Sequence, residues 1–257
     1  MAGETSEQVL PIDCIPKRRD RGVMDWSKFP DDLIQIAGVV PLVLVRALAI
    51  LLISIVFGTI FAFVSRARIP VAAQVLAVYS SFFRGVPILV QILFWYYFLP
   101  TTVGRSLGAL GLSAQILSAD VVVIFTFVLC YSAYLMQTIG AALSSVDSEQ
   151  RLLAETLGYS TVQAHIHVIF PEALVYALPN IFNMFLNILK ALSMGFVVSV
   201  IDIFAKAKII AGTYGDYMVV YAADAVVYWA LCGILYLMLN QFGNRLRGGK
   251  RAYAGEA

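Results

Sequence analysis

Four polar residues recur at helical spacing in an otherwise apolar segment of the chain. Asn180, Asn183, Asn187 and Lys190 follow one another at intervals of three, four and three residues, so on a helix they form one narrow stripe. An ammonium near the centre of a bilayer costs about 2.5 to 3.5 kcal/mol on insertion scales. The stripe is therefore expected to face a bundle interior or a wet cavity, where amide and ammonium groups can meet a polar solute.

Two interpretations of this stripe are open. In the first it lines a translocation path, made of Asn180, Asn183, Asn187, Lys190 and Ser193. In the second it is structural: an aspartate of another helix neutralises the lysine, and the asparagines form hydrogen bonds between helices. The candidate aspartates are Asp120, Asp202 and Asp224.

The other reactive residue types give no pattern of an enzyme or a metal site. His165 and His167 are two residues apart, on different helix faces and not at the i, i+4 spacing of a metal pair. Cys14, Cys130 and Cys232 are odd in number, and a free cysteine packs like a small hydrophobe. No G-x-x-x-x-G-K-[ST] motif occurs in the sequence, so we expect no ATP hydrolysis, cofactor or metal in this chain.

The composition places the elements that carry these residues in a membrane. Of the 257 residues, 60% are apolar and 13% charged, whereas soluble domains average about 45 to 50% and about 25%. Seven of the 16 acidic residues and five of the 18 basic ones precede Leu33, so the rest is poorer still in charge. The net charge of +2 lacks the localised basic excess of a nucleic-acid-binding protein, and no nucleic-acid partner is expected.

A spanning helix needs about 20 mostly apolar residues, and the chain offers five candidates. They are residues 36–64, 87–99, 120–143, 178–204 and 218–242. The second is short, but the amphipathic stretch 71–83 before it could extend it. We predict an all-α fold, a polytopic membrane helix bundle with about five transmembrane helices. The expected organisation is a polar N-terminal tail (1–35), a transmembrane domain (36–243) and a C-terminal tail (244–257).

Lys and Arg near the ends of the spans predict the orientation. Arg245, Arg247, Lys250 and Arg251 place the C-terminal tail in the cytoplasm, and the long loop 144–172 then lies on the same side. With five spans, the N-terminus lies outside. The basic cluster at 17–21 opposes that placement, although acidic residues surround it.

The loop 144–172 is too polar to span a membrane and carries the signals of two short helices. A first helix can begin at a cap near Ser148, and Gly158 then supplies the left-handed residue that commonly ends a helix. Ser160 and Gln163 have the spacing of a capping box, which starts a second helix. We expect a pair of short helices on the cytoplasmic face, which either inserts into a groove of a partner or lies on the membrane surface without one.

These loop residues resemble those of a known family. The run Gln150–Gly158, with a set of residues that follows it, is similar to the cytoplasmic coupling-loop signature of ABC importer permeases for polar amino acids. A second block upstream resembles the same family, and the pair Ala133 and Tyr134 falls between the two. The set after the loop is Ser160, Gln163, Pro171, Glu172, Ala173, Leu178, Pro179, Asn183, Lys190 and Ser193, and the upstream block is Tyr79, Phe83, Arg84, Gly85, Pro87, Leu89, Val90, Gln91, Leu99 and Pro100.

The resemblance, which covers roughly residues 39–247, implies the membrane-spanning permease subunit of a histidine/glutamine/arginine-type importer. Such a subunit lies in the bacterial cytoplasmic (inner) membrane and passes a polar amino acid, or a close analogue, by alternating access. The implied partners are a second permease subunit, two ATPase subunits that bind ATP and Mg²⁺, and an extracytoplasmic substrate-binding protein. The residues that it assigns to ATPase coupling are Gln150, Leu152, Ala154, Glu155, Gly158, Ser160 and Gln163.

The sequence departs from the family pattern at informative places. Leu152 stands where the family has a glutamate, and Glu155 lies three residues on, one helical turn away. Gln137 stands for another glutamate, and Gly140 with the next alanine stands for an Arg-Gly pair. Such departures favour one subunit of a heterodimer over a homodimer.

Arg84, before a glycine and a proline, is expected to end a helix on the cytoplasmic side. A contact with the coupling loop is the second option for its side chain.

Two other functions are rivals to an importer subunit. The first is an ion-coupled secondary carrier, which needs internal inverted repeats and an intramembrane carboxylate. The second is a non-transporting scaffold. The scaffold would leave Lys190 unexplained.

Overall fold

In the computed structural model, the described part of the chain comprises residues 25–67, 69–109, 117–146, 153–154 and 156–254. Every regular element within it is helical, which confirms the all-α prediction. In chain order the elements are η2 (Trp26–Lys28), α1 (Phe29–Ala37), α2 (Val40–Arg66), α3 (Pro70–Gly85), α4 (Ile88–Ala109), α5 (Ala119–Ser145), α7 (Thr161–Ala164), the π-helix η4 (His165–Ile169), α8 (Phe170–Ala191), the 3₁₀ helix η5 (Leu192–Val198), α9 (Ile203–Tyr214) and α10 (Tyr217–Ala254).

The predicted membrane spans are present in these elements. Among the described residues, four helical stretches are long and apolar enough to cross a membrane: Trp26–Arg66, Ala119–Ser145, Val162–Val198 and Tyr217–Gly243. A bent pair, Pro70–Gly85 with Ile88–Gly104, counts as a fifth if it is one broken span. The prediction of about five spans is therefore confirmed at four to five.

The helices α3 and α4 do not join into one straight span, which corrects the expected extension of 87–99 through 71–83. The two helices are bent by 108°. Val86 between them is extended, with φ −87° and ψ 131°, as expected for a residue before a proline. The buried Gln91 stabilises the bend, since its Nε2 donates to the carbonyls of Phe83 at 3.0 Å and Val86 at 2.8 Å.

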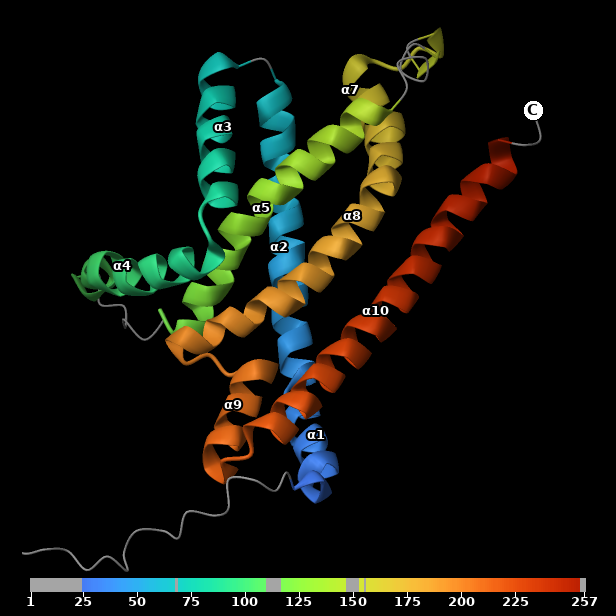
Figure 1. Ribbon diagram of the computed structural model, residues 1–257. Coiled ribbons are helices and arrows are strands. Elements are labelled where there is room, and N and C mark those ends of the chain that lie inside the picture. The colour runs from blue at the N-terminus through green and yellow to red at the C-terminus, as the bar shows by residue number, and fades with distance from the viewer. Residues whose placement is uncertain (1–24, 68, 110–116, 147–152, 155, 255–257) are drawn as a thin grey trace, which may run out of the picture.

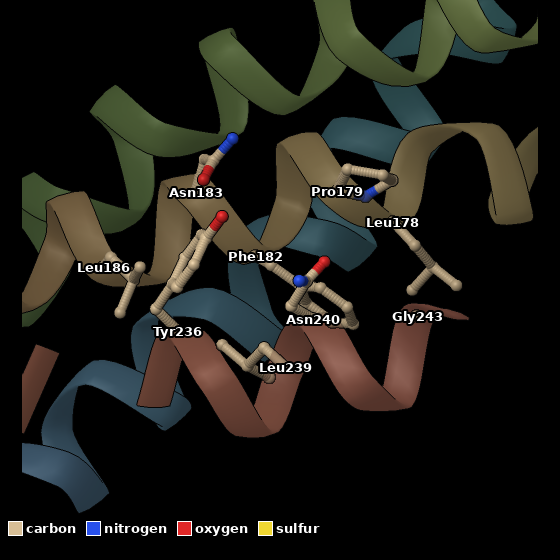
Figure 2. A pocket seen from close by; sticks show the side chains of 9 residues that line it. All are labelled: Leu178, Pro179, Phe182, Asn183, Leu186, Tyr236, Leu239, Asn240 and Gly243. Carbon is tan, nitrogen blue, oxygen red and sulfur yellow. The ribbon is translucent and has the colours of Figure 1, made fainter. Parts of the chain in front are cut away.

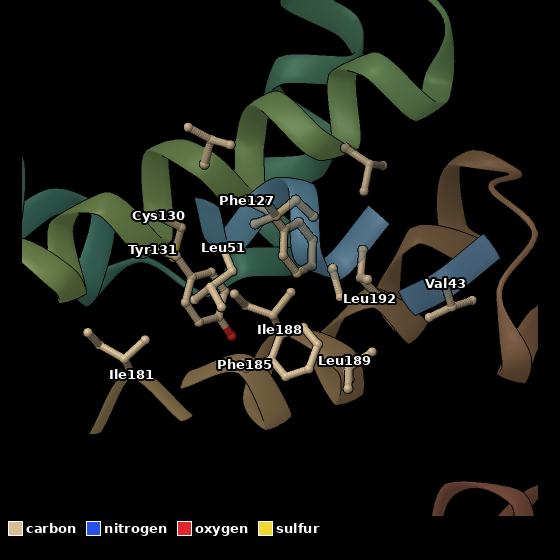
Figure 3. Close-up of a cluster of buried hydrophobic side chains, with 14 of the residues drawn as sticks. Val43, Leu51, Phe127, Cys130, Tyr131, Ile181, Phe185, Ile188, Leu189 and Leu192 are labelled. Atoms are coloured by element: carbon tan, nitrogen blue, oxygen red, sulfur yellow. The ribbon is translucent and has the colours of Figure 1, made fainter. Parts of the chain in front are cut away.

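The core of the bundle lies where α2, α5 and α8 pack together (Figure 1). Close-packed side chains from the three helices meet there, among them Leu51, Phe127 and Ile188 (Figure 3). Gly58 of α2 lies so close to α5 that an added Cβ would be 2.7 Å from the Leu135 Cβ. Because α2 and α5 approach this closely, a side chain at position 58 would push them apart.

The two ends of the bundle carry different elements (Figure 1). The short helix α7, the beginning of α8 and the C-terminal end of α10 lie at one end, and α1 and α9 lie at the other. This agrees with the expectation that the loop 144–172 and the C-terminus share a side. The helices α1 and α10 extend beyond the expected domain limits at residues 35 and 243.

The segment between α5 and α8 keeps the local signals read in its sequence. Gly158 has a positive φ of 87°, and Tyr159 N donates to Ala154 O at 3.1 Å, the bond of a Schellman motif that ends a helix. Ser160 and Gln163 form the predicted capping box, with Ser160 N to Gln163 Oε1 at 3.0 Å and Gln163 N to Ser160 Oγ at 3.4 Å.

The second helix of the expected pair is not a separate short helix. It begins at α7 and continues through the π-helix η4 into α8, so the loop is joined to the fourth span as one helical rod. Pro171 lies in the first turn of α8, immediately after the residue that follows the π-helix η4.

Candidate functional site

The polar stripe lies on α8 as predicted, on one exposed face. Asn180, Asn183, Asn187 and Lys190 are all exposed, whereas Ala177, Ile181, Phe185, Ile188 and Leu189 on the opposite face are buried in the core. Ser193 follows in η5, where its hydroxyl donates to the Lys190 carbonyl at 2.8 Å. In this single chain the stripe is therefore not covered by the bundle's own helices.

Asn183 lines a cavity of about 160 Å³ between α8 and α10 (Figure 2). Tyr236 and Asn240 project into it from α10, and Tyr236 reaches toward Asn183 (Figure 2). The amides and the hydroxyl give the cavity donors and acceptors without any charge. Asn180 lies outside this cavity.

Asn187 and Lys190 line a second and larger cavity, of about 650 Å³. It lies between the stripe, the break between α3 and α4, and the aromatic face of α5 that carries Tyr131 and Tyr134. Arg84 lines the same cavity. Two cationic side chains, an amide and two phenols therefore surround a space large enough for an amino acid.

Arg84 is a site residue whose role sequence reasoning missed. It does end α3, as predicted, but α3 begins at the end of the bundle near α7 and runs away from it (Figure 1). The Arg84 guanidinium lies 5.4 Å from the ring centroid of Tyr134, a cation–π distance, and not at the coupling loop. The only signal in the sequence was the Arg-Gly-Val-Pro run that marks the bend.

The three aspartates proposed to neutralise Lys190 make no ion pair with it among the described residues. Asp120 pairs with Arg46, with Nη2 and Oδ1 2.6 Å apart. Asp202 caps α9 by accepting from Ala205 N at 2.8 Å, and burial raises the pKa of its carboxyl. Asp224 is buried in α10, 7% exposed.

The expected coupling residues that are described lie at the tip beside α7. Ala154 is buried, while Gly158, Ser160 and Gln163 are exposed. Gln150, Leu152 and Glu155 lie outside the described residues. The tip also exposes large apolar side chains, which are Leu153, Leu157, Tyr159, Val162 and Ile166. An exposed apolar cluster of this kind is typical of a surface that a partner protein covers.

No group of three or more His, Cys, Asp or Glu side chains that could hold a metal ion occurs in the described ranges. His167 Nδ1 lies 3.0 Å from the Gln163 carbonyl, within the helix itself. The cavities offer amide, hydroxyl and cationic groups to a polar solute, and the tip exposes an apolar surface.

Comparisons with known proteins agree with this description. Residues 54–248 match the family of binding-protein-dependent transport system inner membrane components. The chain is 35% identical to the probable amino-acid permease protein YxeN of Bacillus subtilis, over 86% of this chain and 95% of that protein. It is 30% identical to the L-cystine transport system permease protein TcyL of the same organism, over 80% of this chain and 85% of that protein.

Solved structures give the same fold. The crystal structure of an amino acid ABC transporter with histidines matches with a TM-score of 0.74 and 24% identity, over 87% of this chain and 99% of that chain. An inward-facing structure of the MetNI methionine ABC transporter matches with a TM-score of 0.57 and 15% identity, over 85% and 94%. The chain therefore belongs to the family of inner-membrane components of binding-protein-dependent transport systems, and it is a membrane-spanning transport subunit rather than an enzyme.

Proposed function

We propose that this subunit passes a polar amino acid, or a close analogue, across the bacterial inner membrane along the stripe of α8. The observation that carries the proposal is the cavity of about 650 Å³ that Asn187, Lys190 and Arg84 all line. Amino acids share a carboxylate, and ammonium and guanidinium groups bind carboxylates with charge-assisted hydrogen bonds. The names of the relatives, an amino-acid permease and a cystine permease, point to the same class of substrate.

The path in this proposal runs along Asn180, Asn183, Asn187, Lys190 and Ser193. The amides, placed a turn apart on one face, offer successive donors and acceptors to a zwitterion. Lys190 at the larger cavity attracts the carboxylate. The ring of Tyr131, which lines that cavity, suits the ammonium of the same molecule through cation–π attraction, while Arg84 already lies over the ring of Tyr134.

A second permease subunit would cover the stripe. Its residues are exposed in a single chain, and polar groups that meet a solute inside a membrane must be enclosed by protein or water. We favour a heterodimer, since Leu152, Gln137 and Gly140 depart from the family pattern and a partner permease could retain it.

Energy would reach the path through the coupling segment, which is the stretch between α5 and α8 that contains Gly158 and α7. In this proposal two ATPase subunits bind ATP and Mg²⁺. Each contacts the exposed apolar cluster around Leu157 and Val162 of one permease subunit. Because α7 continues into α8, closure of the ATPases displaces the stripe itself. That displacement alternates the access of the cavity between the two sides, after an extracytoplasmic binding protein has delivered the substrate.

The sidedness follows from the same assignment. The coupling segment must face the ATPases, so the end of the bundle with α7 and the C-terminal end of α10 is cytoplasmic (Figure 1). The end with α1 and α9 then faces the binding protein.

The test is uptake by the complete transporter, reconstituted in liposomes with its ATPase subunits, second permease and binding protein. A panel of radiolabelled polar amino acids is offered outside, with ATP inside. We expect ATP-dependent uptake of at least one of them, and a loss of that uptake in Lys190→Met. Lys208→Met is the matched control, because Lys208 is a cation of α9 that is not one of the stripe residues and does not line the cavity of Lys190. Uptake that needs no ATP, or that survives Lys190→Met unchanged, would contradict the proposal.

A further inference from the structure

The C-terminal end of α2 contacts both flanks of the coupling segment. On one flank, Arg66 Nη1 donates to the Gly140 carbonyl at 3.0 Å and to Ser144 Oγ at 2.6 Å. On the other flank, the ring of Phe63 lies 5.8 Å from the ring of Phe170, measured between centroids. Residues 140 and 144 lie in the last two turns of α5, and Phe170 is the first residue of α8.

Arg66, Ser144 and the Gly140 carbonyl are joined in a ring of three hydrogen bonds. Ser144 Oγ accepts from the guanidinium and in turn donates to the Gly140 carbonyl at 3.0 Å. A hydrogen bond from a charged donor is about twice as strong as a neutral one. The carbonyl of Gly140 is thus held from a neighbouring helix at the point where α5 ends and the coupling segment begins.

The space around this contact indicates that it is not a simple consequence of tight packing. A Cβ placed on Gly140 would meet nothing within 4 Å, whereas one on Gly58, two turns earlier on α2, would be 2.7 Å from the Leu135 Cβ. The helices α2 and α5 therefore approach closely at Gly58, whereas near the end beside α7 the hydrogen bonds of Arg66 lie at an open site next to buried apolar side chains such as Ala62 and Leu143. Polar contacts at an open end can break and re-form without disturbing a core.

We propose that Arg66 is a positioning residue that links the coupling segment to α2, so that movement of the segment shifts α2 together with α5 and α8. Phe63 provides the second contact, to the beginning of α8. The proposal rests on the proposed role of the coupling segment. It adds a route by which one ATPase contact moves three spans of the same subunit and not the fourth span alone.

The variants follow from the geometry. Arg66→Gln removes the charge and most of the donor geometry, and Ser144→Ala removes one acceptor but leaves the Gly140 carbonyl. Arg66→Lys keeps a cationic donor and should restore part of the function. Ser65→Ala is the matched control, because Ser65 is the exposed neighbour of Arg66 on α2. The effects of Arg66→Gln and Ser144→Ala on coupling are not expected to add in the double variant, since both residues belong to one hydrogen-bond network.

The measurement is the number of substrate molecules imported per ATP hydrolysed, on the complete transporter in liposomes. Thermal stability and retention of the ATPase subunits are followed on the same preparations. We expect Arg66→Gln to lower this ratio at least about fivefold, the lower end of typical coupling between two sites. Retention of the ATPases should stay normal, Arg66→Lys should recover part of the ratio, and Ser144→Ala should fall between. A purely structural contact would instead lower thermal stability and leave the ratio unchanged.

Failure of this proposal is distinguishable from failure of the proposed function. If Gly158→Val abolishes coupling while Arg66→Gln and Ser144→Ala leave the ratio intact, the link through α2 is wrong and the coupling role of the segment stands. If neither Gly158→Val nor Arg66→Gln changes the ratio, the coupling segment itself is misassigned. If Arg66→Gln does not assemble, an unchanged ratio in Ser144→Ala overturns the link.

Discussion

Arg46 of α2 and Asp120 of α5 pair across the end of the bundle that is opposite the coupling segment, with Nη2 and Oδ1 2.6 Å apart. The same guanidinium donates through Nη1 to the Ile201 carbonyl at 2.6 Å. One side chain thus joins α2, the first turn of α5 and the loop before α9. The arginine does not simply extend toward the membrane surface, and Asp120 is engaged away from Lys190.

Substitution of this pair should have unequal effects. Asp120 is 48% exposed and Arg46 14%, so Asp120→Asn should lower the free energy of unfolding by no more than about 1 kcal/mol. Arg46→Met also removes the hydrogen bond to Ile201, and we expect a loss of about 1.5 to 3 kcal/mol. Thermal unfolding in detergent measures both. A double variant clearly less stable than Arg46→Met would argue against a shared contact.

Lys190→Met separates the two interpretations of the stripe. If Lys190 lines the path, the variant should assemble with normal thermal stability while uptake falls. If an aspartate neutralises it, its removal leaves a buried carboxylate unpaired and costs about 3 to 5 kcal/mol. Stability that is lost in Lys190→Met and restored by adding Asp224→Asn would sink the path interpretation, whereas Lys208→Met should leave uptake unchanged.

Gly158 holds the turn of the coupling segment at a φ of +87°. Left-handed backbone costs an ordinary residue roughly 1 to 2 kcal/mol of stability. Valine at this position should cost more, because its side chain is β-branched. Gly158→Asn is the matched control, since asparagine tolerates this region. Co-purification of the ATPase and the import-to-hydrolysis ratio should fall in the valine variant and persist in the asparagine one. Equal behaviour of the two variants would refute the importance of the turn.

Gln91 should be needed for the bend between α3 and α4. Its side chain is 2% exposed and bonds two carbonyls that the break leaves free, so Gln91→Leu should lower the free energy of unfolding by about 1 to 3 kcal/mol. The exposed Gln74 of α3 supplies the control, Gln74→Leu. Comparable stability of the two leucine variants would show that water satisfies the carbonyls instead.

The sequence by itself determined the features that depend on neighbours along the chain. Hydropathy located the spans, because a lipid-exposed helix must be apolar along its length. The Gly158 turn and the capping box of Ser160 and Gln163 were readable, since each is closed by hydrogen bonds over three to five residues. The stripe on α8 was readable for the same reason, as helical periodicity alone places its members on one face.

Only the tertiary structure decided which distant residues meet. Arg66 and Gly140 are 74 residues apart, and Arg46 and Ile201 are 155 apart, and no local pattern distinguishes these partners from other polar residues. The 108° bend brings Arg84 to the cavity of Lys190, although the proline signals a break without setting the direction in which the chain continues. That direction depends on how α3 and α4 pack against α5, which is a property of three surfaces together and not of one stretch of sequence.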